Sequence, residues 1–160
     1  MTVQFTVNGE QKTIQVPPAK RLIDLLREDE HFLDAKHGCN KGICGACVVL
    51  LDGTLVRACL VPAFAVRDRV IMTLEGLAGS SELKIIQEAF NTAGYQPCES
   101  CRSPRLLSTY TLLRQYPAPN ESEIKKWSEE YHCPVCESDA FDEGIWIAAD
   151  RMKELRYERI

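Results

Sequence analysis

Four cysteines in the first half of the chain have the spacing of an iron–sulfur ligand set. The pattern is C-x4-C-x2-C, followed after eleven residues by a fourth cysteine, and its members are Cys39, Cys44, Cys47 and Cys59. This is the plant-type spacing for a [2Fe–2S] cluster. Three thiolates then come from one tight loop, and the fourth comes from a neighbouring segment. The spacing therefore predicts one [2Fe–2S] cluster in this half of the chain.

Glycines lie beside these cysteines, where a tight loop needs them. We expect Gly38, Gly42 and Gly45 to adopt positive φ, which glycine does without a Cβ clash. Such a loop directs backbone N–H groups inward, and hydrogen bonds from these groups to sulfur tune the reduction potential of a cluster. Gly42 and Gly45 are therefore predicted to take part in cofactor binding.

A second set of cysteines forms two C-x2-C pairs in the other half of the chain. Its members are Cys98, Cys101, Cys133 and Cys136. Each pair can present two thiolates to one metal ion. Two such pairs are also the pattern of a structural zinc site, so three alternatives stay open: a [2Fe–2S] cluster, zinc or another metal, and an empty site. His132 adjoins the second pair and adds a mixed Cys/His site as a further alternative.

The composition limits the class of protein. The 160 residues suffice for one domain or two small ones, and a net charge of −4 gives no reason to expect a nucleic-acid partner. No apolar run approaches the roughly 20 residues that span a membrane. The first residues contain no basic segment followed by an apolar one, so no signal peptide is predicted. We therefore expect a cytoplasmic protein whose eight cysteines bind metal rather than form disulfides.

The elements of the first half predict a small mixed sheet crossed by one helix. Alternating or continuous apolar residues predict strands over 3–7, 13–16, 48–51, 54–59 and 66–73. Asn8-Gly9 and Asp52-Gly53 are hairpin signals. Apolar residues at helical spacing predict a helix over 22–26, and the acidic residues 28–30 are expected to be its solvated end. Residues 1–76 should thus form an α+β domain, compatible with a β-grasp ferredoxin.

The second half is predicted to be a helical domain over residues 77–160, entered through a linker at 76–81. Apolar spacing predicts helices over 83–90, 103–116 and 120–131, and a last helix from about 142 that runs past 152 and includes 155. Gly94 should close the first of them, and Asn120 with Glu123 should form a capping box. Arg102 and Arg105 are expected at a solvated helix start, with pairing to an anionic cofactor or partner as the alternative. The large aromatic residues Phe90, Trp127, Phe141 and Trp146 should pack in a core or an interface.

Two longer motifs make the chain resemble a known family. They are GCNKGICGACVVLLDG over residues 38–53 and TLEGL over residues 73–77. With them, residues 1–76 resemble the N-terminal domain of the iron–sulfur subunit of molybdenum hydroxylases, which include xanthine dehydrogenases, aldehyde oxidoreductases and aerobic carbon monoxide dehydrogenases. A four-helix domain with two cysteine pairs is similar to that family's C-terminal domain, which holds a second [2Fe–2S] cluster near the molybdenum site.

The resemblance implies a non-catalytic electron-transfer subunit. Electrons would leave a molybdopterin cofactor on a large partner subunit, pass through two [2Fe–2S] clusters, and reach FAD on a medium partner subunit or another acceptor. No P-loop, dinucleotide-binding glycine pattern or nucleophile elbow occurs in the sequence, so the chain shows no motif for binding flavin or nicotinamide by itself. The substrate of such a complex would be determined by the molybdenum subunit.

The second cysteine set departs from the family pattern. The family places Gln directly before C-G-x-C, whereas here Pro97 separates Gln96 from Cys98, and one residue is added before Pro104. The family's last pair is C-R-C, and here it is C-x2-C. Gln96, which the resemblance suggests as a molybdopterin contact, is thereby displaced. An alternative function follows: a one-cluster ferredoxin-like carrier or redox sensor with a zinc-stabilised helical docking domain.

Overall fold

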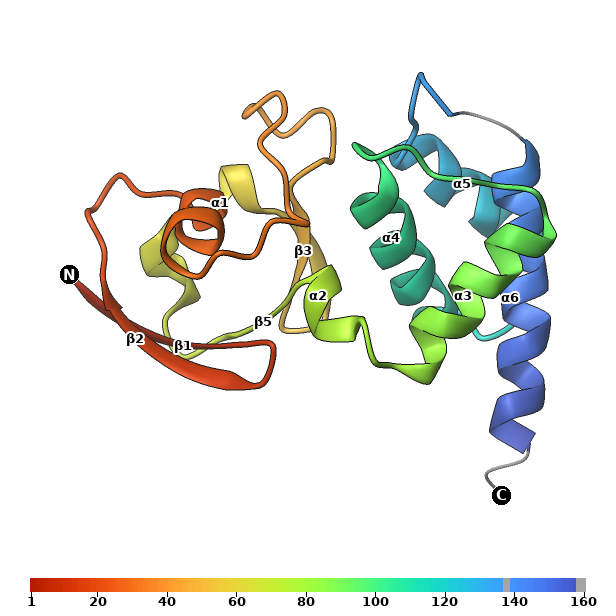
Figure 1. The fold of residues 1–160 in the computed structure, drawn as a ribbon, viewed down its shortest axis with the longest axis horizontal. Coiled ribbons are helices and arrows are strands. Elements are labelled where there is room, and N and C mark those ends of the chain that lie inside the picture. The colour runs from red at the N-terminus through yellow and green to blue at the C-terminus, as the bar shows by residue number, and fades with distance from the viewer. Residues whose placement is uncertain (137–138, 158–160) are drawn as a thin grey trace. The chain divides into compact units, whose positions relative to one another are not determined.

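The computed structural model describes residues 1–136 and 139–157 and divides the chain into two compact units, residues 1–78 and 79–160 (Figure 1). The first unit is a mixed sheet with one crossing helix, and the second unit consists of helices. The fold class is therefore α+β, as the sequence predicts. No helix in the described part of the chain is long and apolar enough to cross a membrane.

The sheet of the first unit has five strands in the order β2-β1-β5-β3-β4. Their bounds are Thr2–Val7 (β1), Glu10–Gln15 (β2), Val48–Leu51 (β3), Thr54–Arg57 (β4) and Val70–Met72 (β5). Strands β1 and β5 run parallel, and the other neighbours are antiparallel. Both predicted hairpin turns are present, with positive φ at Asn8, Gly9, Asp52 and Gly53, as type I′ turns require.

Two predicted strands are shorter than the sequence pattern indicates. The strand expected over 66–73 is reduced to β5, because the chain first makes a 3₁₀ turn over Ala63–Val66 and then a turn with positive φ at Asp68. The strand expected over 54–59 ends at Arg57, and Cys59 lies in a 3₁₀ turn over Ala58–Leu60. The Ala58 N–H donates to the Cys47 carbonyl at 3.1 Å, which ties the segments that carry Cys47 and Cys59 together.

The crossing helix begins as α1 (Leu22–Asp24) and continues as a π-helical turn over Leu25–Asp29. Its acidic end is solvated only in part. Glu30 has a side chain that is 8% exposed and pairs with Lys12 at 3.3 Å, so the expectation of a solvated acidic end is wrong for this residue. Because Lys12 lies in β2, this ion pair joins segments that are distant in the sequence, and local spacing does not predict it.

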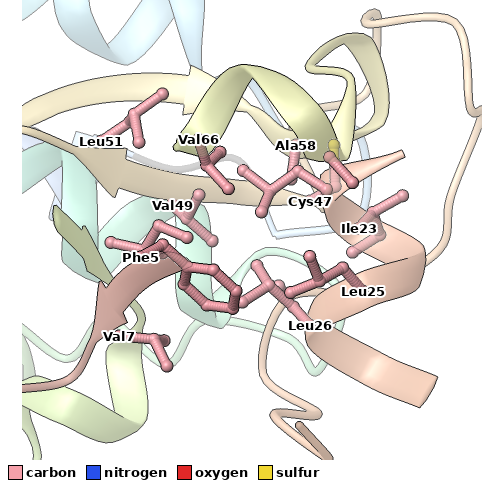
Figure 2. Close-up of a cluster of buried hydrophobic side chains, with 14 of the residues drawn as sticks. Phe5, Val7, Ile23, Leu25, Leu26, Cys47, Val49, Leu51, Ala58 and Val66 are labelled. Atoms are coloured by element: carbon pink, nitrogen blue, oxygen red, sulfur yellow. The ribbon is translucent and has the colours of Figure 1, made fainter. Parts of the chain in front are cut away.

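The core of the first unit packs this helix against one face of the sheet. Figure 2 shows its side chains, among them Phe5 from β1, Leu26 from the crossing helix and Val49 from β3. Cys47 belongs to the same buried cluster and is 3% exposed. The end of the cysteine loop is therefore fixed by the hydrophobic packing that stabilises the fold.

The second unit contains the four predicted helices. They are Ser81–Thr92 (α3), Arg102–Gln115 (α4), Glu121–Glu130 (α5) and Asp139–Tyr157 (α6). Gly94 has φ +73° just after the end of α3, and Asn120 with Glu123 forms both bonds of a capping box, at 2.9 and 2.7 Å. These cap predictions are confirmed. Helix α6 begins three residues earlier than expected.

Aromatic contacts hold α3 against α6. The ring centroids of Phe90 and Phe141 lie 5.6 Å apart, and Tyr95 packs against both rings at 5.2 Å. Gly144 of α6 allows the close approach, since a Cβ there would lie 2.7 Å from Phe90. Trp146 does not belong to this core, because 45% of it is exposed, and its predicted packing in an interface stays a prediction.

The TLEGL motif connects the sheet to the cysteine loop within the first unit. Thr73 is fully buried and exchanges two hydrogen bonds with the side chain of Asn8, at 2.9 and 3.0 Å. It precedes the short helix α2 (Leu74–Leu77), in which Glu75 accepts a 2.8 Å hydrogen bond from the N–H of Asp34. Gly76 packs so closely that a Cβ would clash with the Asn8 amide and with Met72.

Replacing Gly76 with alanine should therefore destabilise the first unit. The overpacking should lower the free energy of unfolding by about 1–3 kcal/mol, measured by denaturant unfolding followed through the loss of sheet circular dichroism. Gly79→Ala is the matched control, because a Cβ at Gly79 meets nothing within 4 Å. Equal stabilities of the two variants would contradict the role assigned to the close contact.

Candidate metal centres

The first cysteine loop surrounds sulfur atoms with backbone N–H groups. The Sγ of Cys39 accepts hydrogen bonds from the amides of Lys41, Ile43 and Cys44 at 3.2–3.4 Å. The amide of Cys39 in turn donates to the Sγ of Cys44 at 3.3 Å. The loop thus has the inward-facing amides that the glycine pattern predicts, and such amides favour the negatively charged form of a sulfur ligand.

The glycines of this loop act for two different reasons. Gly42 and Gly45 have φ of +73° and +72°, as expected. Gly38 does not have positive φ, and that expectation is wrong. Gly38 is instead required for space, because a Cβ there would lie 2.5 Å from the Sγ of Cys44. Asn40 adopts the left-handed conformation in its place, with φ 54°.

The loop gives its sulfur atoms contrasting acidities. Hydrogen bonds from the amides of Cys44, Lys41 and Ile43 lower the pKa of Cys39 to about 6. Burial raises the pKa of Cys47 to about 11. The first thiol is therefore prepared as a thiolate at neutral pH, whereas the buried thiol loses its proton only when a metal ion replaces it.

Hydrogen bonds join the four cysteines of the first set in two pairs. Cys39 and Cys44 are hydrogen-bonded to each other, and so are Cys47 and Cys59. Two pairs of thiolates are what a centre with two irons needs, so this geometry fits a [2Fe–2S] cluster.

Two residues that the sequence reasoning missed hold the loop in place. The Nη1 group of Arg27 donates hydrogen bonds to the carbonyls of Leu33 and Ala35, at 2.9 and 2.7 Å. Glu75 binds the amide of Asp34, as described above. Both contacts join residues that lie apart in the sequence. The only sequence signal was the position of Glu75 in the TLEGL motif.

The second cysteine set converges from the ends of four helices. Cys98 and Cys101 lie between α3 and α4, and Cys133 and Cys136 lie between α5 and α6. All four sulfur atoms are within 4.8 Å of one another. Individual Sγ–Sγ distances are 3.5 Å from Cys98 to Cys101, 3.7 Å from Cys98 to Cys133 and 2.9 Å from Cys101 to Cys136.

The dimensions of this compact group are closer to those of a single-ion site than to those of a two-iron cluster. With metal–sulfur bonds of about 2.3 Å, the edge of a sulfur tetrahedron is about 3.8 Å. In a [2Fe–2S] centre, thiolates on opposite irons lie on the order of 6 Å apart, because the two irons are bridged by sulfides. The Sγ–Sγ distances of 3.5 and 3.7 Å are close to the edge of a tetrahedral site, whereas the 2.9 Å distance from Cys101 to Cys136 must lengthen for either occupant. A two-iron cluster requires a larger separation of the pairs than a single ion does.

Tyr95, which the sequence analysis did not single out, contacts the second group, and Arg105 follows Cys101 by one turn of α4. The Tyr95 hydroxyl lies 3.6 Å from the Sγ of Cys136 and 3.9 Å from that of Cys101. Burial raises the pKa of Tyr95, so the hydroxyl keeps its proton and can donate to sulfur. Arg105 is 2% exposed, so the expectation of a solvated position is wrong for it, whereas Arg102 is exposed.

Gln96 is exposed and lies beside this group. Its Nε2 donates to the side chain of Asn91 at 3.2 Å. It also lines a cavity of ≈ 320 Å³ within the second unit, together with Tyr95, Arg102 and Leu106. His132 is exposed and is absent from the four-sulfur group found among the described residues.

Comparison with known proteins identifies the family. Residues 5–71 match the 2Fe-2S iron-sulfur cluster binding domain. The chain is 38% identical over 124 residues to the nicotinate dehydrogenase small FeS subunit of Eubacterium barkeri, a match that covers 78% of this chain and 79% of that protein. The chain belongs to the family of iron–sulfur subunits of molybdenum hydroxylases. Within this family, the small iron–sulfur subunit transfers electrons, and the catalytic site lies on other subunits.

Two further relatives agree with this membership. The chain is 37% identical over 122 residues to the nicotine 6-hydroxylase small subunit of Paenarthrobacter nicotinovorans, a match that covers 76% of this chain and 73% of that protein. A solved structure of quinoline 2-oxidoreductase from Pseudomonas putida 86 matches 96% of each chain, with a TM-score of 0.86 and 28% identity. The similarity to that structure therefore extends over both units.

Substitution of Gly38 by alanine should impair the first metal centre. The added Cβ would displace the Sγ of Cys44, so less of the cluster should be incorporated, measured as iron and visible absorption per chain. Gly79→Ala is the control, since Gly79 has no positive φ and a Cβ there meets nothing within 4 Å. Full cluster content in the Gly38→Ala protein would show that the loop tolerates the methyl group.

Proposed function

We propose that the chain relays electrons through two [2Fe–2S] clusters in a molybdenum hydroxylase complex. The first cluster would be held by Cys39, Cys44, Cys47 and Cys59, in the loop shaped by Gly42 and Gly45. The second would be held by Cys98, Cys101, Cys133 and Cys136. Each cluster accepts and releases one electron at a time. The single observation that supports the proposal is that each unit of a chain belonging to this family carries one set of four cysteines.

The proposed partners are a large subunit with molybdopterin and a medium subunit with FAD. The names of the relatives support this proposal, because they describe small or iron–sulfur subunits of dehydrogenases and oxidoreductases. The second centre would receive electrons from the molybdenum site, and the first would pass them to the flavin. Gln96 is proposed as a contact to the molybdopterin, on the support of its place in a cavity beside the second centre.

A cytoplasmic location belongs to the same proposal. All eight cysteines are free thiols in the structure, and reducing compartments keep thiols available as metal ligands.

Metal analysis of the purified chain tests the two-cluster proposal. We expect four irons and four acid-labile sulfides per chain, with two distinct EPR signals on reduction. Purification from cells should also yield the larger partner subunits. Two irons, two sulfides and a single EPR signal would overturn the two-cluster relay.

A specific observation favours a second candidate for the helical unit. The four sulfur atoms lie within 4.8 Å of one another and come from two C-x2-C pairs, which suits a structural zinc ion. The chain would then be a one-cluster carrier or redox sensor whose helical unit serves for docking. This candidate predicts one zinc per chain beside two irons, so the same metal analysis separates it from the two-cluster relay.

Single substitutions should assign each metal to its ligands. Cys44→Ser should remove the first EPR signal and leave the metal of the second unit in place, because the two cysteine sets lie in separate units. Cys101→Ser is the reciprocal variant and should affect only the second metal. An unchanged first signal in Cys44→Ser would refute the ligand assignment.

A further inference from the structure

Arg105 is a buried cation without a hydrogen-bonded anion among the described residues. It lies in α4 and is 2% exposed. Its Nε and Nη1 atoms are buried, and neither has a hydrogen-bond partner in the described part of the chain. A guanidinium remains protonated in a protein interior, so burial does not neutralise it. Such a charge is costly unless a negative charge lies close to it.

Arg105 is connected to the second cysteine group through its helix and through two aromatic rings. Its amide donates to the Cys101 carbonyl at 2.9 Å, which places it one helical turn after that cysteine. Its guanidinium lies over the ring of Phe141, 3.9 Å from the centroid. Phe141 packs on Tyr95, whose hydroxyl contacts the sulfur atoms of Cys101 and Cys136. The positive charge of Arg105 also acts on Tyr95, where it favours the anionic form of the phenol.

The metal centre proposed above would supply the missing negative charge. Four thiolates around Zn²⁺ carry a net charge of about −2, and four thiolates around an oxidised [2Fe–2S] core carry about the same. A reduced cluster carries one further negative charge. Either occupant is therefore an anion in a buried position, because Cys101 and Cys133 are 5% and 6% exposed.

We propose that Arg105 is the internal counter-charge of the metal centre in the helical unit, and that the Tyr95 hydroxyl assists it as a hydrogen-bond donor to sulfur. Arg105 is thus a positioning residue that stabilises the metal-loaded site electrostatically. This inference rests on the metal centre proposed in the preceding subsection, whichever metal it holds. Because a nearby positive charge favours the more negative state, Arg105 should raise the reduction potential if the centre is a cluster.

Four variants of the full chain test this role. Arg105→Met removes the charge and keeps a long apolar side chain, and Arg105→Lys keeps the charge without the planar group. Tyr95→Phe removes only the hydroxyl and keeps the aromatic packing. Arg102→Met is the matched control, since Arg102 lies in the same helical turn and is exposed.

The readouts are the metal content, the retention of metal against a chelator, and the midpoint potential of each EPR signal. Arg105→Met should weaken metal retention at the second centre about 10- to 100-fold, as is typical when a partner of metal ligands is lost. If that centre is a cluster, its midpoint should also fall, while the midpoint of the first cluster stays unchanged. Arg105→Lys should retain most of both properties, Tyr95→Phe should show a smaller loss, and Arg102→Met should match the wild type.

The outcomes distinguish this inference from the function on which it rests. A normal second centre that does not respond to Arg105→Met would overturn the counter-charge role alone. Equal losses in Arg105→Lys and Arg105→Met would overturn it as well, because they would show that packing on Phe141 matters and charge does not. If Arg105→Met fails to fold, a loss of metal in Arg105→Lys as complete as in Cys101→Ser would overturn the counter-charge role, because the lysine keeps the positive charge. A wild-type chain without a second metal would overturn both proposals.

Discussion

Each unit must bring four cysteine thiolates together and compensate their negative charge. Each thiolate that enters a site needs hydrogen-bond donors, a metal ion or a nearby cation, because a bare buried anion is costly. The first unit meets this need with backbone amides, which point at Cys39 and Cys44 in an exposed loop. The helical unit provides side-chain groups instead, the Tyr95 hydroxyl and the Arg105 guanidinium.

The two solutions explain how each unit is built. The exposed loop needs glycines, since amides can surround a sulfur atom only where the backbone turns tightly and side chains leave room. The loop is then fixed at its ends, by Cys47 in the hydrophobic core and by Glu75 at the amide of Asp34. The helical unit instead places its cysteine pairs between helix ends. Aromatic packing of Phe90, Tyr95 and Phe141 determines where those ends lie.

Features that depend on neighbours in the sequence could be predicted, and features that depend on distant contacts could not. A few adjacent residues suffice to predict the cysteine spacing, the Asn8-Gly9 turn and the Asn120 capping box. The burial of Arg105 could not be predicted, because it depends on a contact with Phe141, which is far along the chain. The role of Gly38 could not be predicted either. Glycine is needed there because a Cβ would clash with a sulfur atom, and this contact is visible only in the folded loop.

The compact second group and the buried arginine are two aspects of one electrostatic problem. Sulfur atoms within 4.8 Å of one another concentrate negative charge more than two separated pairs do. Since Cys101 and Cys133 are buried, water screens that charge poorly, and a fixed cation nearby becomes correspondingly effective. Arg105 follows Cys101 by one helical turn, so the helix that presents the cysteine also holds the cation in register with it. A change that spreads the sulfur atoms apart would therefore reduce the need for Arg105, which links the identity of the metal to the charge that surrounds it.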